Sequence, residues 1–279
     1  MASDIDELVN GHAYGVVDAT MRSRLPQGVR PVPLVPRRLA GSAHLMPALI
    51  DLGSAPEPVL QNLFAGDDRA VRGTRDPVVS VLLKTTVGMD EVERRWNAMQ
   101  LVSPDGRGFA WLRMHDPRVL HQLFRILSAA QCRHLFGRID AITYWIGGDR
   151  IERTIGSRAQ QPLANRDWAR VARIGVVNRA LERACMRDAA GLDACSQTVE
   201  EALDRAASRY GLLEVGDLTE FGFRALVCRS GFDDDPRVAA AISQHAANRR
   251  DSSLSDHFPL IDPDVWRTLR NDAWSETGD

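Results

Sequence analysis

The hydrophobic pattern of this chain changes its period near residue 160, and this change limits the folds open to it. Before that point, short apolar runs rich in β-branched residues alternate with segments whose apolar residues recur at helical spacing. After it, the apolar residues recur only at helical spacing. This order predicts an α/β N-terminal lobe with a mixed sheet and helices, followed by an all-α C-terminal lobe. The polar segment 156–165 contains Gly and Pro, so we place the α/β lobe at residues 1–158 and the helical lobe at residues 159–279.

Several apolar runs in the first lobe have the length and composition of strands. Between two of them, Ser54 and Glu57 have the spacing of a capping box, so a helix is expected from there to Gly66. Gly147-Gly148 predicts a hairpin turn, and Pro104-Asp105-Gly106 predicts another turn between strands. The expected strands cover residues 14–19, 46–52, 77–84, 100–102, 108–114, 139–146 and 150–155.

Helix boundaries in the second lobe follow from capping signals. Thr198 and Glu201 have capping-box spacing before one apolar face, and Asp217 and Glu220 have it before the next. The glycines that follow these faces are expected to end the two helices. Asp-Pro pairs, with Asp as N-cap and Pro at the first helical position, are expected to begin two more helices. The glycines are Gly211 and Gly231, and the pairs are Asp235-Pro236 and Asp262-Pro263.

Composition places the chain among ordinary globular proteins. Hydrophobic residues make up 44% of the 279 residues and charged residues 26%, which excludes a disordered or low-complexity chain. No apolar run approaches the roughly 18 residues of a membrane-spanning helix. Residues 1–10 are acidic and lack the pattern of a signal peptide, and the 4 cysteines form no CxxC pair. We therefore expect a cytoplasmic protein without a disulfide framework and without contact to a membrane.

Charge is distributed unevenly along the chain. Residues 94–187 carry 17 basic and 7 acidic side chains, whereas residues 188–279 carry 9 basic and 18 acidic ones. Such asymmetry is typical of an interaction surface, and nucleic-acid binding through residues 94–187 is one alternative. The aromatic residues of this segment fall in expected strands or on apolar helix faces, and the pI of about 6.4 is low for a nucleic-acid-binding protein. These aromatic residues include Trp96, Phe109, Trp111, Tyr144, Trp145 and Trp168.

The sequence lacks the common catalytic motifs, namely GxxxxGK[ST], GxGxxG, HExxH and GxSxG. His115-Asp116 is the only adjacent His-Asp pair, and neighbours at a strand–helix junction point in different directions. Asp116 also has a local role as N-cap. We therefore predict no catalytic residue and no cofactor, with an enzyme whose unrecognised site lies near His115 and Asp116 as the alternative.

Two clusters could suggest a metal site. Asp233-Asp234-Asp235 lacks the ligand spacing of a calcium loop and lies at an expected helix start, where negative charge is favourable. Cys132 and His134 lack the two further ligands that zinc needs. We predict a solvated cap for the first cluster, packing for the second, and no metal.

One segment, Arg113-Met114-His115-Asp116-Pro117-Arg118, has two arginines beside a capping carboxylate. Asp116 can accept backbone N–H groups and still bind a guanidinium in bidentate geometry. Two interpretations stay open: an ion network that fixes a strand–helix corner, or direct contact with a partner. The candidate site residues are Arg113, Asp116, Pro117 and Arg118.

At these residues the sequence resembles the effector chaperones, or adaptors, of type VI secretion, a family long catalogued only as a domain of unknown function. FAWLRMHDPRVLHQLF (Phe109–Phe124) has the family's strand, arginine and helix-opening Asp-Pro-Arg-Val-Leu, here Arg113 and Asp116–Leu120. YGVVDAT (Tyr14–Thr20) resembles its first strand, and LFGRID (Leu135–Asp140) resembles its aromatic-Gly element before a strand.

The resemblance continues more weakly in the helical lobe and covers about Tyr14 to His245. The matching positions there are Ala206, Tyr210-Gly211, Asp217-Leu218 and Gly231-Phe232-Asp233. The chain departs from the family at His115, where an aromatic residue is usual, and in Pro26–Ala43, which has no evident counterpart. The resemblance implies a non-enzymatic cytoplasmic protein that binds a toxin effector and helps to load it on the VgrG spike.

Overall fold

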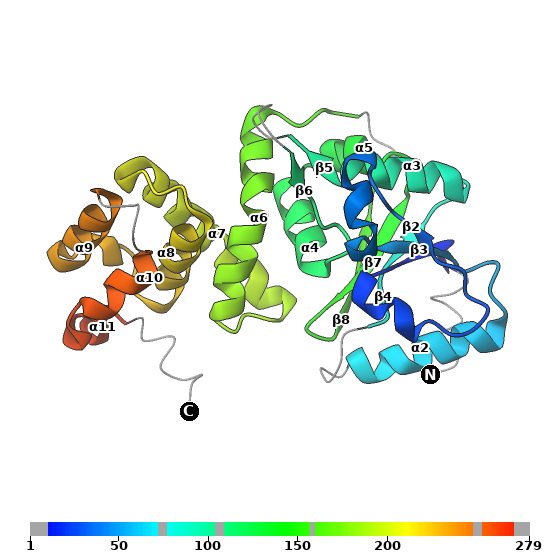
Figure 1. Ribbon diagram of the computed structural model, residues 1–279, viewed down its shortest axis with the longest axis horizontal. Helices are drawn as coiled ribbons and strands as arrows, with labels where there is room; N and C mark the ends of the chain where they lie inside the picture. The colour runs from blue at the N-terminus through cyan, green and yellow to red at the C-terminus, as the bar shows by residue number, and fades with distance from the viewer. Residues whose placement is uncertain (1–10, 72–76, 104–108, 157–159, 248–252, 271–279) are drawn as a thin grey trace. The chain divides into compact units, whose positions relative to one another are not determined.

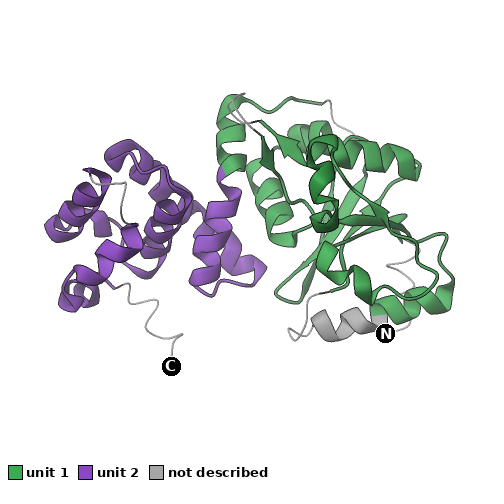
Figure 2. Ribbon diagram, in the orientation of Figure 1, with its two compact units in different colours: residues 1–172 green, residues 173–279 purple. Residues whose placement is uncertain are grey.

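The computed structural model describes residues 11–71, 77–103, 109–156, 160–247 and 253–270. The chain separates into two compact units, residues 1–172 and residues 173–279 (Figure 2). Unit 1 is built around a β-sheet and unit 2 is helical, so the predicted fold class is confirmed. The division falls within α6 (Asn165–Arg183), whereas the predicted lobe boundary after residue 158 lies outside the described residues and stays a prediction.

The main sheet of unit 1 has six strands in the order β2-β3-β1-β4-β7-β8 (Figure 1). All of its described strand pairs are antiparallel, although the alternating pattern predicts a mixed sheet. The reason is topological: β3 and β4 run parallel to each other and are joined through a helix, but β1 lies between them. The strands are β1 (Tyr14–Val17), β2 (Val32–Pro33), β3 (Ala48–Asp51), β4 (Val79–Lys84), β7 (Ala141–Ile146) and β8 (Asp149–Thr154).

Helices cover both faces of this sheet. Neighbouring residues of the buried strand β7 point to opposite faces, and two of them contact different helices. Trp145 packs in a cluster with Leu60 and Phe64 of α2 (Glu57–Val71). Tyr144 stacks on Phe124 of α4 (Pro117–Ile126), with 6.2 Å between the ring centroids. The sheet is therefore the middle layer of unit 1, with α2 on one face and α4 on the other (Figure 1).

The segment between β4 and β7 holds the elements that form the candidate site. It contains α3 (Met89–Met99), the short hairpin of β5 (Leu101–Val102) and β6 (Ala110–Trp111), then α4 and α5 (Ala129–Phe136). The predicted turn at residues 104–106 lies outside the described residues. The predicted turn at Gly147-Gly148 is confirmed: both residues have positive φ, and β7 and β8 pair on either side of them.

Two local predictions in unit 1 are corrected, and one helix was missed. The Ser54 hydroxyl donates to Asp51 Oδ2 rather than capping a helix, and α2 begins only at Glu57. Gly66 does not end α2, which continues to Val71. Helix α5 was not expected, although its capping box of Ser128 and Gln131 is complete.

Unit 2 contains the C-terminal part of α6 and a set of helices around an apolar core. Leu203 and Ala206 of α7 are buried, as are Leu218 and Phe221 of α8, and these two helices pack together. Phe232 lies 5.0 Å from Phe221 between ring centroids. The elements are α7 (Ala189–Tyr210), α8 (Val215–Val227), η3 (Phe232–Asp234), α9 (Pro236–Ala247), α10 (Leu254–His257), η4 (Phe258–Leu260) and α11 (Pro263–Leu269).

The capping boxes predicted for unit 2 are wrong, whereas the Asp-Pro starts are confirmed. Thr198 lies in the interior of α7, and Asp217 is a buried residue inside α8. Helix α7 ends at Gly211, as expected, in left-handed conformation. Helix α8 ends before Cys228, so Gly231 is not its end. In the pairs Asp235-Pro236 and Asp262-Pro263, the aspartate carboxylate accepts a backbone N–H group at the start of α9 and of α11, respectively.

Candidate partner-binding corner

Asp116 is the N-cap of α4, and Pro117 occupies the first helical turn, as predicted. Asp116 Oδ1 accepts the backbone N–H of Arg118 at 3.0 Å. The Arg118 guanidinium returns to the same carboxylate, with Nε 3.2 Å from Oδ1 and Nη2 3.1 Å from Oδ2. One carboxylate thus caps the helix and fixes an arginine in bidentate geometry.

Arg113 does not join this ion pair in the described part of the chain. Its side chain is exposed, and its guanidinium carbon lies 5.7 Å from the centroid of the Trp111 ring. This is a cation–π distance. The two arginines of the motif therefore have different surroundings: Arg118 is tied to Asp116 and Arg113 lies over an indole.

His115 points away from Asp116 and into the protein. Its side chain is only 2% exposed, and Nε2 lies 3.1 Å from Asp18 Oδ2, in the loop after β1. Asp18 also accepts hydrogen bonds from the backbone N–H and hydroxyl of Thr20, so it caps η1 (Ala19–Arg24). The hydrogen bond from His115 is the largest cause that holds the pKa of Asp18 well below its usual range, and the bonds from Thr20 add to it.

A second set of contacts connects the corner with the C-terminal end of α3 and the segment after β2. The Trp111 indole stacks on the His115 ring at 5.5 Å between centroids, and its Nε1 donates to Gln100 Oε1 at 3.1 Å. Gln100 is fully buried and donates from Nε2 to the carbonyl oxygen of Leu34. Segments far apart in the sequence are thus held together by polar contacts around His115.

The chemistry that the corner presents to solvent is cationic. The Arg118 side chain is 42% exposed and Arg113 is exposed, whereas His115 is covered by protein. A guanidinium at a partly covered surface suits carboxylate partners, because it is weakly hydrated and donates in a planar fork. The sequence had indicated the Asp116–Arg118 pair, but it gave no reason to connect His115 with Asp18. The only available signal was that both residues lie in segments that carry the family resemblance.

Those segments lie inside a region that matches a known family. Residues 14–134 match the family model described as Domain of unknown function (DUF4123). The DUF4123 region begins with β1, includes Asp18, His115, Asp116 and Arg118, and ends within α5. Neither the curated proteins nor the solved structures contain a significant match to the chain.

Other candidate groups of the sequence have structural surroundings. Asp235 caps α9, but Asp233 is 1% exposed and pairs with Arg205, so the Asp233–Asp235 cluster is not a wholly solvated cap. Cys132 is buried, and burial raises the pKa of its thiol to about 11. Within the described ranges, no three side chains of the metal-binding types gather at one point. Likewise, none of the described helices is both long enough and apolar enough to cross a membrane.

The aromatic residues of the basic segment pack mainly in the interior of the DUF4123 region and β7. Trp96 and Tyr144 are fully buried, and Trp145 is nearly so. Phe109 is exposed, and the Arg38 guanidinium carbon lies 4.0 Å from its ring centroid. Core packing thus accounts for Trp96, Tyr144 and Trp145, whereas Trp111 and Trp168 are half-buried.

Replacing Asp116 with alanine is expected to lower the free energy of unfolding by about 1 kcal/mol, because α4 loses its N-cap. The ion pair should add little, because Arg118 is 42% exposed and screened by solvent. Asp116→Asn keeps an oxygen for the Arg118 backbone N–H and should retain most of the stability. Urea denaturation of both variants tests this expectation. Equal destabilisation by Ala and Asn would instead assign the effect to the charge.

Proposed function

We propose that this protein is a cytoplasmic, non-enzymatic chaperone, or adaptor, that binds a type VI secretion toxin effector and assists its loading onto the VgrG spike. The observation that carries the proposal is the match of residues 14–134 to the DUF4123 family model. This region contains the Tyr14–Thr20 and Phe109–Phe124 segments, on which the resemblance to the effector chaperones rests.

The geometry of the corner supports this proposal, because its His115 and Asp116 side chains are bound by other protein groups and its arginines face solvent. His115 and Asp116 each bind another protein group, Asp18 and Arg118 respectively. What faces solvent is a pair of arginines held by their surroundings, Arg113 by Trp111 and Arg118 by Asp116. Preordered arginines lose less conformational entropy on binding, so they suit protein contacts.

The charge distribution also fits a protein with two different partners. Residues 94–187 are strongly basic and residues 188–279 are strongly acidic. Complementary charge speeds the encounter with one partner and disfavours the other. A loading chaperone meets both a toxin and a spike, so two surfaces of opposite charge would keep these contacts distinct.

Co-expression tests the proposal directly. We expect the affinity-tagged chain to retain the toxin encoded beside its gene, and to retain VgrG in the presence of that toxin. The gene is expected between a spike gene and a toxin gene. The matched control is the same purification with a toxin from an unrelated secretion cluster, which should not be retained. A folded chain that retains neither neighbouring product, or that turns over a substrate, would contradict the proposal.

A further inference from the structure

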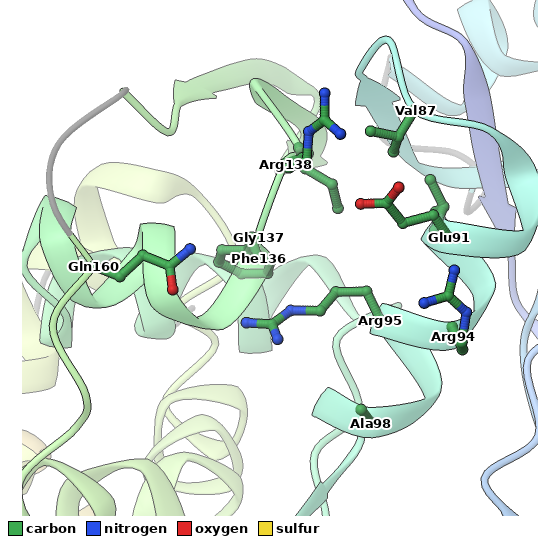
Figure 3. Close-up of a pocket in the computed structure, with 11 residues that line it drawn as sticks. Val87, Glu91, Arg94, Arg95, Ala98, Phe136, Gly137, Arg138 and Gln160 are labelled. Atoms are coloured by element: carbon green, nitrogen blue, oxygen red, sulfur yellow. The ribbon is translucent and has the colours of Figure 1, made fainter.

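Away from the corner, unit 1 has a groove of about 480 Å³ between α3 and the turn that leads from α5 to β7 (Figure 3). Helix α3 contributes Glu91, Arg94 and Arg95 to its lining, and the turn contributes Gly137 and Arg138. The lining is therefore basic, with three guanidinium groups and one carboxylate. Figure 3 shows the Glu91 carboxylate on the side of the groove that carries Arg138, with Arg94 and Arg95 further along α3.

The position of Arg95 is fixed by the backbone around it. Its Nε donates to the carbonyl oxygen of Leu135 at 2.8 Å, which leaves the two terminal nitrogens available to a ligand. Gly137, with φ of +65°, closes over this side chain, and a Cβ there would lie 3.2 Å from Arg95 Nε. Burial lowers the pKa of Arg95, so a bound carboxylate would stabilise its charged form.

Neither Arg94 nor Arg138 forms an ion pair with any residue that the structure describes. Both side chains are exposed. Many other arginines are held by acidic neighbours, as Arg118 is by Asp116 and Arg205 is by Asp233. Glu91 can offset only one of the three positive charges in the groove, so the lining keeps a net positive charge.

Apart from Gln160, the side chains of the remaining lining are apolar, and they limit which anionic partner fits. Ala98 is exposed and Val87 is 8% exposed, so these two supply the aliphatic surface beside the arginines, whereas Ile139 is buried. Phe136 is 0% exposed and stacks on Phe124, so it cannot stack on a nucleic-acid base. Sequence-independent binding of single strands depends on such exposed aromatic surfaces. Guanidinium groups next to aliphatic surface match a polypeptide in which acidic and apolar side chains alternate.

We propose that this groove binds an acidic segment of the partner protein, with its carboxylates on Arg94, Arg95 and Arg138 and apolar side chains against Val87 at one end and Ala98 at the other (Figure 3). Identifying that partner as the toxin rests on the proposed function above. The groove itself is defined by chemistry alone, so it can be tested without the toxin.

The test uses a display library of random dodecapeptides selected on the full-length chain. Peptides that bind should be enriched in Asp and Glu relative to the starting library. The variant Arg94→Glu/Arg138→Glu should lose the enrichment, and a selected peptide should bind it at least about tenfold more weakly. Arg150→Glu/Arg153→Glu makes the same charge change on exposed residues of β8, so its affinity should stay within about twofold of the wild type. Added salt should weaken binding to the wild type.

Other outcomes would overturn the inference. These are a selection without enrichment of acidic residues, an equal loss of affinity in both double variants, and oligothymidylate binding that is tighter than peptide binding and lost in the groove variant. Co-purification separates this inference from the proposed function. If the wild type retains no toxin, the proposed function fails; if the wild type and Arg94→Glu/Arg138→Glu retain it equally, only the assignment of the groove to that partner fails.

Discussion

Replacing Asp217 with alanine is expected to lower the free energy of unfolding of unit 2 by about 3–5 kcal/mol. Asp217 is buried in α8, and its Oδ2 lies 2.7 Å from Nε2 of His245 in α9. Its Oδ1 accepts the backbone N–H of Leu254 at 2.8 Å, at the start of α10. One carboxylate therefore holds three helices together.

The cost is large because the groups left behind stay buried. His245 is 1% exposed, and its Nδ1 has no hydrogen-bond partner among the residues that the structure describes. Without Asp217, both ring nitrogens would lack a protein partner, and the Leu254 N–H would lose its acceptor. A buried polar group without a partner costs about 1–3 kcal/mol, so two such losses reach the expected range.

Hydrogen exchange of the full-length chain measures this effect locally. Peptides from α8, α9 and α10 should exchange faster in Asp217→Ala, while those from β1, β4 and β7 should not change. Asp204→Ala is the matched control, because it removes an exposed carboxylate of α7 that pairs with Arg173. The control should change exchange little. Equal protection in Asp217→Ala and the wild type would show that the pair does not stabilise unit 2.

The features that sequence predicted well are those set by neighbouring residues. The Asp-Pro starts of α4, α9 and α11 depend on a side chain and a backbone N–H two residues away. The hairpin at Gly147-Gly148 depends on two residues that tolerate positive φ. Such signals act within one turn of chain, so they survive in any tertiary context.

Strand direction and helix interiors depend on distant residues, and there the predictions of a mixed sheet and of two capping boxes were wrong. The antiparallel sheet follows from the position of β1 between β3 and β4, which no local pattern specifies. Thr198 and Asp217 each precede a Glu at capping-box spacing, but the same spacing is compatible with a helix interior. In α8 the burial of Asp217 against His245 decides its role.

In the candidate site too, the local contacts could be predicted from sequence and the long-range contacts could not. The bidentate pair of Asp116 and Arg118 was accessible from sequence, because the two residues lie within one helical start. The contact between Asp18 and His115 joins two segments that are far apart in the sequence and adjacent only in the folded protein. The groove around Arg95 and Arg138 likewise needs α3 and the turn after α5 side by side. Charge counts had indicated that the segment was basic without showing which arginines share a surface.

Removing the Asp18 carboxylate is the second change with a large expected effect. It should lower the free energy of unfolding by about 2–3 kcal/mol at neutral pH. Asp18→Ala would take the partner from Nε2 of His115, a ring that is 2% exposed and whose Nδ1 has no described hydrogen-bond partner. It would also remove the cap of η1, where Thr20 donates twice. Asp51→Ala is the matched control, because it removes the acceptor of the exposed Ser54 hydroxyl. It should lower the free energy of unfolding by less than Asp18→Ala does.

The effect of Asp18→Ala should depend on pH in a defined direction. The folded protein holds the pKa of Asp18 well below the ordinary value of 3.8, chiefly through the hydrogen bond from His115. A depressed folded-state pKa gives stability that is complete above the unfolded-state pKa and is lost as the pH falls toward the folded-state value. The difference in unfolding free energy between wild type and Asp18→Ala should therefore be constant near neutrality and shrink below about pH 4. A difference that grows on acidification would contradict this account.

The same variant separates the two interpretations of the corner. If Asp18 and His115 only position the strand–helix junction, Asp18→Ala should retain the proposed partner, a toxin effector, at temperatures well below its melting transition. Under those conditions the exposed arginines keep their places on α4 and over Trp111. Arg113→Glu/Arg118→Glu should then lose the toxin without a comparable loss of stability, because Arg118 is 42% exposed and Arg113 is exposed. Loss of toxin from Asp18→Ala in its folded state would instead place the buried side of the corner in the binding surface.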